Sequence, residues 1–196
     1  MNPMPSSDTS RFSPRLPVLL FFLLLAVAGR VSHLYLPNLP NFAPLDAMAL
    51  FGGAYFARKR WAVLMPLLAV WGSDLLLNYQ YTGHWQLLYP GWYWQYGCYA
   101  LLALLAHAGL RQVTPLRVAL GATTAAVIFF LVSNFGVWVG SGMYPHTGGG
   151  LLACYAAAVP FFSHSLLSNL VYCGVLFGGF ELAQWRFPVL GRVVGV

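Results

Sequence analysis

The sequence predicts an all-α integral membrane protein, a bundle of six membrane-spanning helices with both chain ends in the cytoplasm. The composition carries the first part of this prediction: of 196 residues, 59% are hydrophobic and only 7% are charged. An ordinary soluble domain has about 25% charged residues, so this chain lacks the side chains that would cover a soluble surface. A soluble enzyme, a nucleic-acid-binding protein and a disordered chain are therefore excluded.

Apolar runs separated by basic or proline-containing segments define the expected spans, because one crossing needs about 20 apolar residues. The segment 36–44 contains three prolines, which lack a backbone donor and break a helix. Asp46 is placed to cap the short second span. The expected spans are residues 17–35, 46–57, 61–77, 94–110, 118–138 and 166–185. Residues 151–162 are expected as a separate short helix that lies at the membrane edge or re-enters it, divided from the last span by Pro160, Ser163 and His164.

The positions of the basic residues predict the orientation. Arg30 alone lies away from the N-terminus, the alternate loops and the C-terminus, where the other nine are found: Arg11, Arg15, Arg58, Lys59, Arg60, Arg111, Arg117, Arg186 and Arg192. Cytoplasmic loops carry the excess of Lys and Arg. Residues 1–16 and 186–196 are therefore expected as cytoplasmic tails, and residues 17–185 as the six-span domain.

Cysteines and histidines give no sign of a metal or haem site. Cys98, Cys154 and Cys173 lack metal-ligand spacing and lie in apolar runs, where a free cysteine behaves as a small buried hydrophobe. No histidine pair has the i, i+4 spacing of helical ligands. We expect no cofactor and no metal.

Polar side chains within the spans are the candidates for function, because a polar group in hydrocarbon is costly unless it is paired. With accompanying aromatic residues they fall on the outer half or the outer loops, and we expect them to line an outward-facing pocket capped by the loops 79–94 and 140–150. The expected substrate-binding residues are Asn41, Asp74, Asn134, Trp138, Tyr144, His146, Tyr155, His164 and Asn169. The alternative for Asp74 is a pair with Arg30, and for the two spanning Asn residues it is a hydrogen bond between helices.

Small residues repeat every four positions in the second span, at Ala49, Gly53 and Ala57. Such a strip lets two helices approach closely. It predicts either close packing inside the bundle or a docking surface for a separate membrane partner.

Several motifs resemble an uncharacterised bacterial family of membrane proteins assigned to transport. The motifs are the stretch 41–56 (NFAPLDAMALFGGAYF), Ser73-Asp74, residues 133–138 (SNFGVW), Tyr144-Pro145 with Thr147, and residues 154–162 (CYAAAVPFF). That family is similar in size and hydropathy to the substrate-binding S components of energy-coupling-factor vitamin transporters. The resemblance implies an S-component-like protein of the bacterial inner membrane that binds a vitamin or related nutrient, such as cobalamin. It also implies a possible energy-coupling transmembrane subunit with ATPases as partner, although the first span has no AxxxA motif.

The function predicted from the sequence is therefore uptake or binding of a small molecule rather than catalysis. Two alternatives remain open at this point. One is a membrane assembly subunit without a ligand, for which the small-residue strip would be the functional surface. The other is a lipid-modifying membrane enzyme, which usually carries clustered acidic residues or a nucleophile with its base.

Overall fold

The computed structural model describes residues 15–32 and 43–191, and these ranges form helices with no β-strand among them. The elements are α1 (Arg15–Val31), α2 (Leu45–Tyr55), α3 (Lys59–Thr82), α4 (Trp92–Gly109), α5 (Pro115–Gly140), α6 (Gly148–Arg186) and the short 3-10 helix η2 (Pro188–Leu190). The all-α prediction is confirmed. Three helices, α3, α5 and α6, are long and apolar enough to cross a membrane, which suggests a membrane protein.

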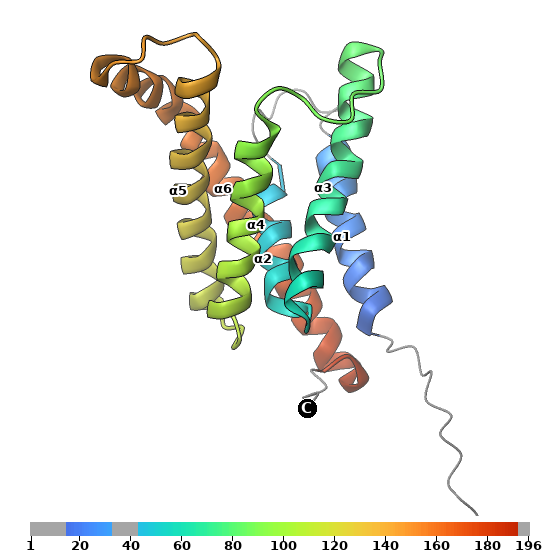
Figure 1. Cartoon of the computed structure of the whole chain (residues 1–196). Coiled ribbons are helices and arrows are strands. Elements are labelled where there is room, and N and C mark those ends of the chain that lie inside the picture. The colour runs from blue at the N-terminus through green and yellow to red at the C-terminus, as the bar shows by residue number, and fades with distance from the viewer. Residues whose placement is uncertain (1–14, 33–42, 192–196) are drawn as a thin grey trace, which may run out of the picture.

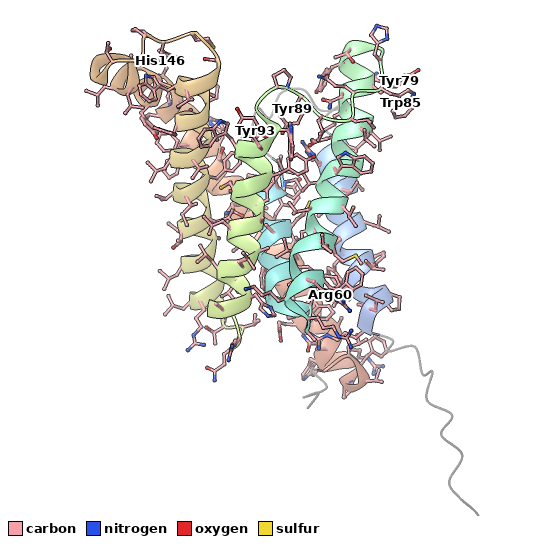
Figure 2. All side chains as sticks on the ribbon, in the orientation of Figure 1. Arg60, Tyr79, Trp85, Tyr89, Tyr93 and His146 are labelled. Carbon is pink, nitrogen blue, oxygen red and sulfur yellow. The ribbon has the colours of Figure 1, made fainter. Side chains whose placement is uncertain are left out.

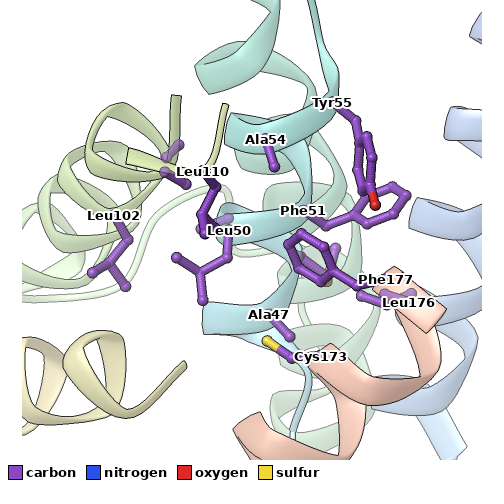
Figure 3. Close-up of a cluster of buried hydrophobic side chains, with 14 of the residues drawn as sticks. Ala47, Leu50, Phe51, Ala54, Tyr55, Leu102, Leu110, Cys173, Leu176 and Phe177 are labelled. Carbon is purple, nitrogen blue, oxygen red and sulfur yellow. The ribbon is translucent and has the colours of Figure 1, made fainter. Parts of the chain in front are cut away.

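Helix α2 forms the centre of the bundle. Ten of its 11 residues are buried, and it packs against α3, α4, α5 and α6. Figure 3 shows Leu50 facing Leu102 of α4 and Leu110 just beyond that helix, while Phe51 lies on the side of Phe177 of α6. At 1.5 Å per residue α2 is roughly 17 Å long, about half the thickness of the hydrocarbon core. The expected second span is therefore a half-length helix enclosed by longer ones.

The small-residue strip of α2 packs inside the bundle. A Cβ added at Gly53 would lie 2.3 Å from the carbonyl oxygen of Ala103 on α4, so only glycine permits this approach. Ala49 is fully buried, whereas Ala57, just beyond the helix, is exposed. This arrangement matches the internal-packing alternative. It leaves Ala49 and Gly53 buried among the helices of the bundle, and only Ala57 of the strip at the surface.

Helix α6 is one continuous element of 39 residues, so the expected division into a short helix and a separate last span is wrong. Pro160 lies inside the helix. Proline has no N–H to donate to the Ala156 carbonyl one turn earlier, but the helix continues through it. The hydroxyls of Ser163 and Ser165 donate to the carbonyl oxygens of Pro160 and Phe161, each at 3.1 Å. In Figure 1, α6 begins beside the far end of α5 and runs through the bundle to the C-terminus.

The two ends of the bundle differ in chemistry. Figure 1 places the starts of α1, α3 and α5 and the ends of α2, α4 and α6 at the bottom of the view. This end, here called the basic end, carries all but one of the described Lys and Arg residues: Arg15, Arg58, Lys59, Arg60, Arg111, Arg117 and Arg186. Figure 2 shows the opposite end, the aromatic end, with Tyr79, Trp85, Tyr89, Tyr93 and His146. The loops that sequence patterning assigned to one side of a membrane therefore do lie together.

Candidate functional site

Asp74, the most prominent sequence candidate, is engaged in a buried ion pair. Its Oδ1 lies 2.6 Å from Nη2 of Arg30, and its Oδ2 accepts a hydrogen bond from the Tyr96 hydroxyl. Nη1 of Arg30 also donates to Ser73 Oγ and, at 3.3 Å, to the Val70 carbonyl. The cluster joins α1, α3 and α4 and neutralises both charges. Asp74 is only 6% exposed, and both of its oxygens are occupied, as the pairing alternative expects.

Asn169 joins two helices. Its Nδ2 donates to the carbonyl oxygen of Ala122 on α5 at 2.7 Å, and its side chain is buried. The adjacent Ser168, also buried, donates to the Ala43 carbonyl at 3.0 Å and so fixes the residues that lead into α2. Asn169 therefore makes the inter-helix hydrogen bond that was its alternative role.

Asn134 and Tyr155 lie where α5 meets the first turns of α6. The Tyr155 hydroxyl donates to the Leu131 carbonyl at 2.7 Å, while Asn134 Nδ2 donates back to Phe130 of its own helix. Asn134 also lines a cavity of about 350 Å³ between α5 and α6, here called the α5–α6 cavity. This cavity is separate from the Asp74 cluster, so the structure does not bring Asp74 and Asn134 to one site.

The remaining sequence candidates lie mostly in the loop between α5 and α6. Trp138 Nε1 donates to the Pro145 carbonyl, and His146 Nε2 lies 3.0 Å from the Trp138 carbonyl oxygen, so these residues brace the loop. Tyr144 is half-buried in the same loop. His164 is exposed on α6, with Nδ1 3.2 Å from the Pro160 carbonyl oxygen. Asn41 lies outside the described residues.

A cavity that the sequence did not reveal lies at the N-terminus of α2. It has a volume of about 240 Å³ and is here called the inner cavity. Four elements enclose it, because α2 begins halfway along the bundle and α4, α5 and α6 pass above its first turn. The lining residues are Ala43, Leu45, Asp46, Gln95, Tyr99, Phe129 and Ser165.

Two polar groups of the inner cavity have no partner. Asp46 is 8% exposed, and no hydrogen bond or ion pair to its carboxylate occurs among the described residues, so the expected capping bond is not made. The Tyr99 hydroxyl is buried without a hydrogen-bond partner, and the residue is 1% exposed. Leaving a buried polar group unsatisfied costs about 1–3 kcal/mol, and more for a charged one. Native proteins leave few such groups, so the pair marks a place where a ligand can bind.

The rest of the lining supplies a further donor and an aromatic wall. The Tyr89 hydroxyl donates to Gln95 Oε1 at 2.7 Å, which leaves the Gln95 amide nitrogen as a donor. Burial raises the pKa of Tyr89, in the loop before α4, to about 12, so this hydroxyl stays protonated. The rings of Tyr99 and Phe129 stack at 5.4 Å with only 8° between their planes.

The inner cavity adjoins two others through shared residues. Gln95 also lines a cavity of about 390 Å³ between α4 and α5 at the aromatic end, here called the upper cavity. Ser165 and Phe129 also line the α5–α6 cavity. The inner cavity therefore shares wall residues with both of these hollows.

Among the residues that the structure describes, no three His, Cys, Asp or Glu side chains lie close enough together to hold a metal ion. The expectation that the three cysteines are free and buried is confirmed for Cys98, Cys154 and Cys173.

Comparison with curated proteins and with solved structures gives no match. A family model does match residues 10–190, nearly the whole chain, and its description is a family of unknown function. The chain therefore belongs to this family of unknown function, DUF6580.

Proposed function

We propose that this chain is a multi-pass membrane protein that captures a compact small molecule from the side of its aromatic end and releases it on the side of its basic end. In this proposal the basic end faces the cytoplasm of a bacterium, the chain ends lie there, and the polypeptide passes through the inner membrane six times. The gathering of the described basic loops at one end supports this orientation.

The inner cavity is the observation that carries the proposal. A half-length helix with its N-terminus inside the bundle is how many transporters build a site near the middle of the membrane. Here that N-terminus opens on a cavity with Asp46, Gln95, Tyr99 and Ser165 among apolar neighbours. A mostly apolar hollow with a few placed polar groups is what a small-molecule site requires.

The cavity volumes and the exposed surface of α1 narrow what the resemblance to S components implies about the ligand and the partner. The individual cavities measure a few hundred Å³, which favours a compact vitamin or nutrient over one as bulky as cobalamin. Most of the exposed residues of α1 are large, among them Phe21, Leu24 and Leu25, and Ala28 is the small one. A close-packed docking helix needs small residues, so the proposal favours a protein that acts without an energy-coupling subunit.

The test compares a variant that fills the inner cavity with a control variant that changes an exposed side chain of the same helix. Ser165→Trp places a large ring in the shared wall of the inner and α5–α6 cavities, whereas Leu167→Trp, two residues along the same helix, changes a side chain that is 56% exposed. Both variants and the wild type are expressed in bacteria and purified in detergent. Mass spectrometry then compares the compounds released from each protein and the compounds depleted from each growth medium.

We expect the wild type and Leu167→Trp to retain or take up the same compound, and Ser165→Trp to lose it while remaining monodisperse. If no compound distinguishes Ser165→Trp from the wild type in either measurement, the proposed function is wrong.

A further inference from the structure

We infer that the inner cavity selects a compact organic cation, with a protonated nitrogen bound to the Asp46 carboxylate and hydrogen-bonded to the Tyr99 hydroxyl. This inference rests on the proposed function, because it names the ligand class of the same cavity. It goes beyond that proposal in assigning the charge of the ligand and the two side chains that recognise it.

The charge of the lining is the first argument. Among the described lining residues, Asp46 is the only one with a carboxylate, and none is Lys, Arg or His. Arg30, the only described basic residue away from the basic end, is committed to Asp74. A buried carboxylate without a counter-charge is unfavourable, and a cation that hydrogen-bonds to it relieves that penalty. The cavity therefore lacks one positive charge, which the ligand would supply.

The arrangement of hydrogen-bonding groups is the second argument. The Tyr99 hydroxyl is buried and unpartnered among the described residues, and Tyr99 lines the same small volume as Asp46. A hydroxyl both accepts and donates, so it can accept one N–H of a nitrogen whose other N–H groups point at the carboxylate. The Gln95 amide nitrogen remains free to donate to an acceptor elsewhere on the ligand.

The aromatic wall and the volume limit what the cation can be. The stacked rings of Tyr99 and Phe129 belong to residues of the cavity lining, and aromatic rings attract cations. The volume of about 240 Å³ equals roughly eight water molecules at about 30 Å³ each. A protonated amine, an amidinium or a cationic ring of modest size fits these limits, whereas a large cofactor does not.

The experiment uses two probes that share a ring and a shape but differ in charge. Benzamidinium is cationic and benzamide is neutral. Each is titrated against the full-length protein in phosphatidylcholine nanodiscs, and binding is followed by calorimetry. We expect the wild type to bind benzamidinium at least about tenfold more tightly than benzamide, the difference typical of one charge-assisted hydrogen bond.

Three variants separate recognition from folding. Asp46→Asn should abolish the preference for benzamidinium and leave the two probes within about twofold of each other. Tyr99→Phe should weaken benzamidinium binding by about fivefold, in line with one neutral hydrogen bond. Glu181→Gln removes a carboxylate at the basic end, where it accepts from the Tyr55 hydroxyl, and should bind both probes as the wild type does. Circular dichroism checks that all three variants are folded.

The inference is overturned if the wild type shows no preference for benzamidinium, or if Asp46→Asn keeps the preference. Either result can occur even if mass spectrometry shows that Ser165→Trp loses a compound that the wild type retains. In that case the proposed function stands and the ligand is not a cation. If instead Ser165→Trp behaves as the wild type in cells, the proposed function fails whatever the calorimetry gives.

Discussion

Two buried carboxylates of this protein should respond in opposite ways to the same substitution. Asp74→Asn breaks an ion pair of 2.6 Å with Arg30 and leaves the guanidinium buried without a counter-charge. Removing one partner of a buried pair costs about 3–5 kcal/mol. Because the substituted amide still accepts from Tyr96, we expect the lower end, about 3 kcal/mol. At about 2–4 °C per kcal/mol for a chain of this length, the unfolding temperature should fall by roughly 6–12 °C.

Asp46→Asn removes a buried charge that has no described partner, and it keeps the size of the side chain. The free energy of unfolding of the ligand-free protein should therefore stay the same or rise by up to about 2 kcal/mol. The assay is thermal unfolding of both variants and the wild type in the same detergent, followed by far-UV circular dichroism. If Asp46→Asn loses as much stability as Asp74→Asn, Asp46 has a structural partner and the argument for a vacant ligand group is refuted.

Three further predictions concern packing, orientation and the helix interfaces. Gly53→Ala should lower stability by about 1–3 kcal/mol because its Cβ meets the Ala103 carbonyl, whereas Gly97→Ala, with open space beside it, should not, and thermal unfolding compares them. The cysteine of His84→Cys should react with an impermeant maleimide in intact cells, and that of Arg60→Cys only after the cells are permeabilised; labelling of both in intact cells would contradict the orientation. Asn169→Ala should cost about 1 kcal/mol of stability yet leave benzamidinium binding unchanged; a loss of binding would return Asn169 to the site.

The sequence was sufficient for the positions of most helices. Apolar runs between basic and proline-rich segments predict α1, α3, α4 and α5 to within about six residues at each end, because the pattern that defines these helices is local. Alternation of basic loops also predicts which helix ends lie together. The continuity of α6 could not be predicted, since whether a proline such as Pro160 ends a helix or lies inside it depends on tertiary packing.

The candidate site was harder to predict because its members are ordinary in sequence. Asp46 looks like a helix cap, and Tyr99 looks like one more aromatic residue in an apolar run. Their significance appears only when α4 and α5 pass above the start of α2, which is a property of the tertiary arrangement. The partner of Asp74 is equally non-local: Arg30 lies 44 positions earlier in the chain, and the pairing could be named only as an alternative.

The polar residues of this bundle therefore divide according to whether the protein itself satisfies them. Asp74, Asn169 and Tyr155 have partners on neighbouring helices, so their hydrogen bonds hold the bundle together. Asp46 and the Tyr99 hydroxyl have none among the described residues, and both residues line the hollow at the start of the half-length helix α2. Because polar residues are rare in membrane spans, the sequence singles out those with partners and those without partners equally. Only the absence of an internal partner separates them, because a group already satisfied gains little from a ligand, whereas an unsatisfied one gains the whole of its missing interaction.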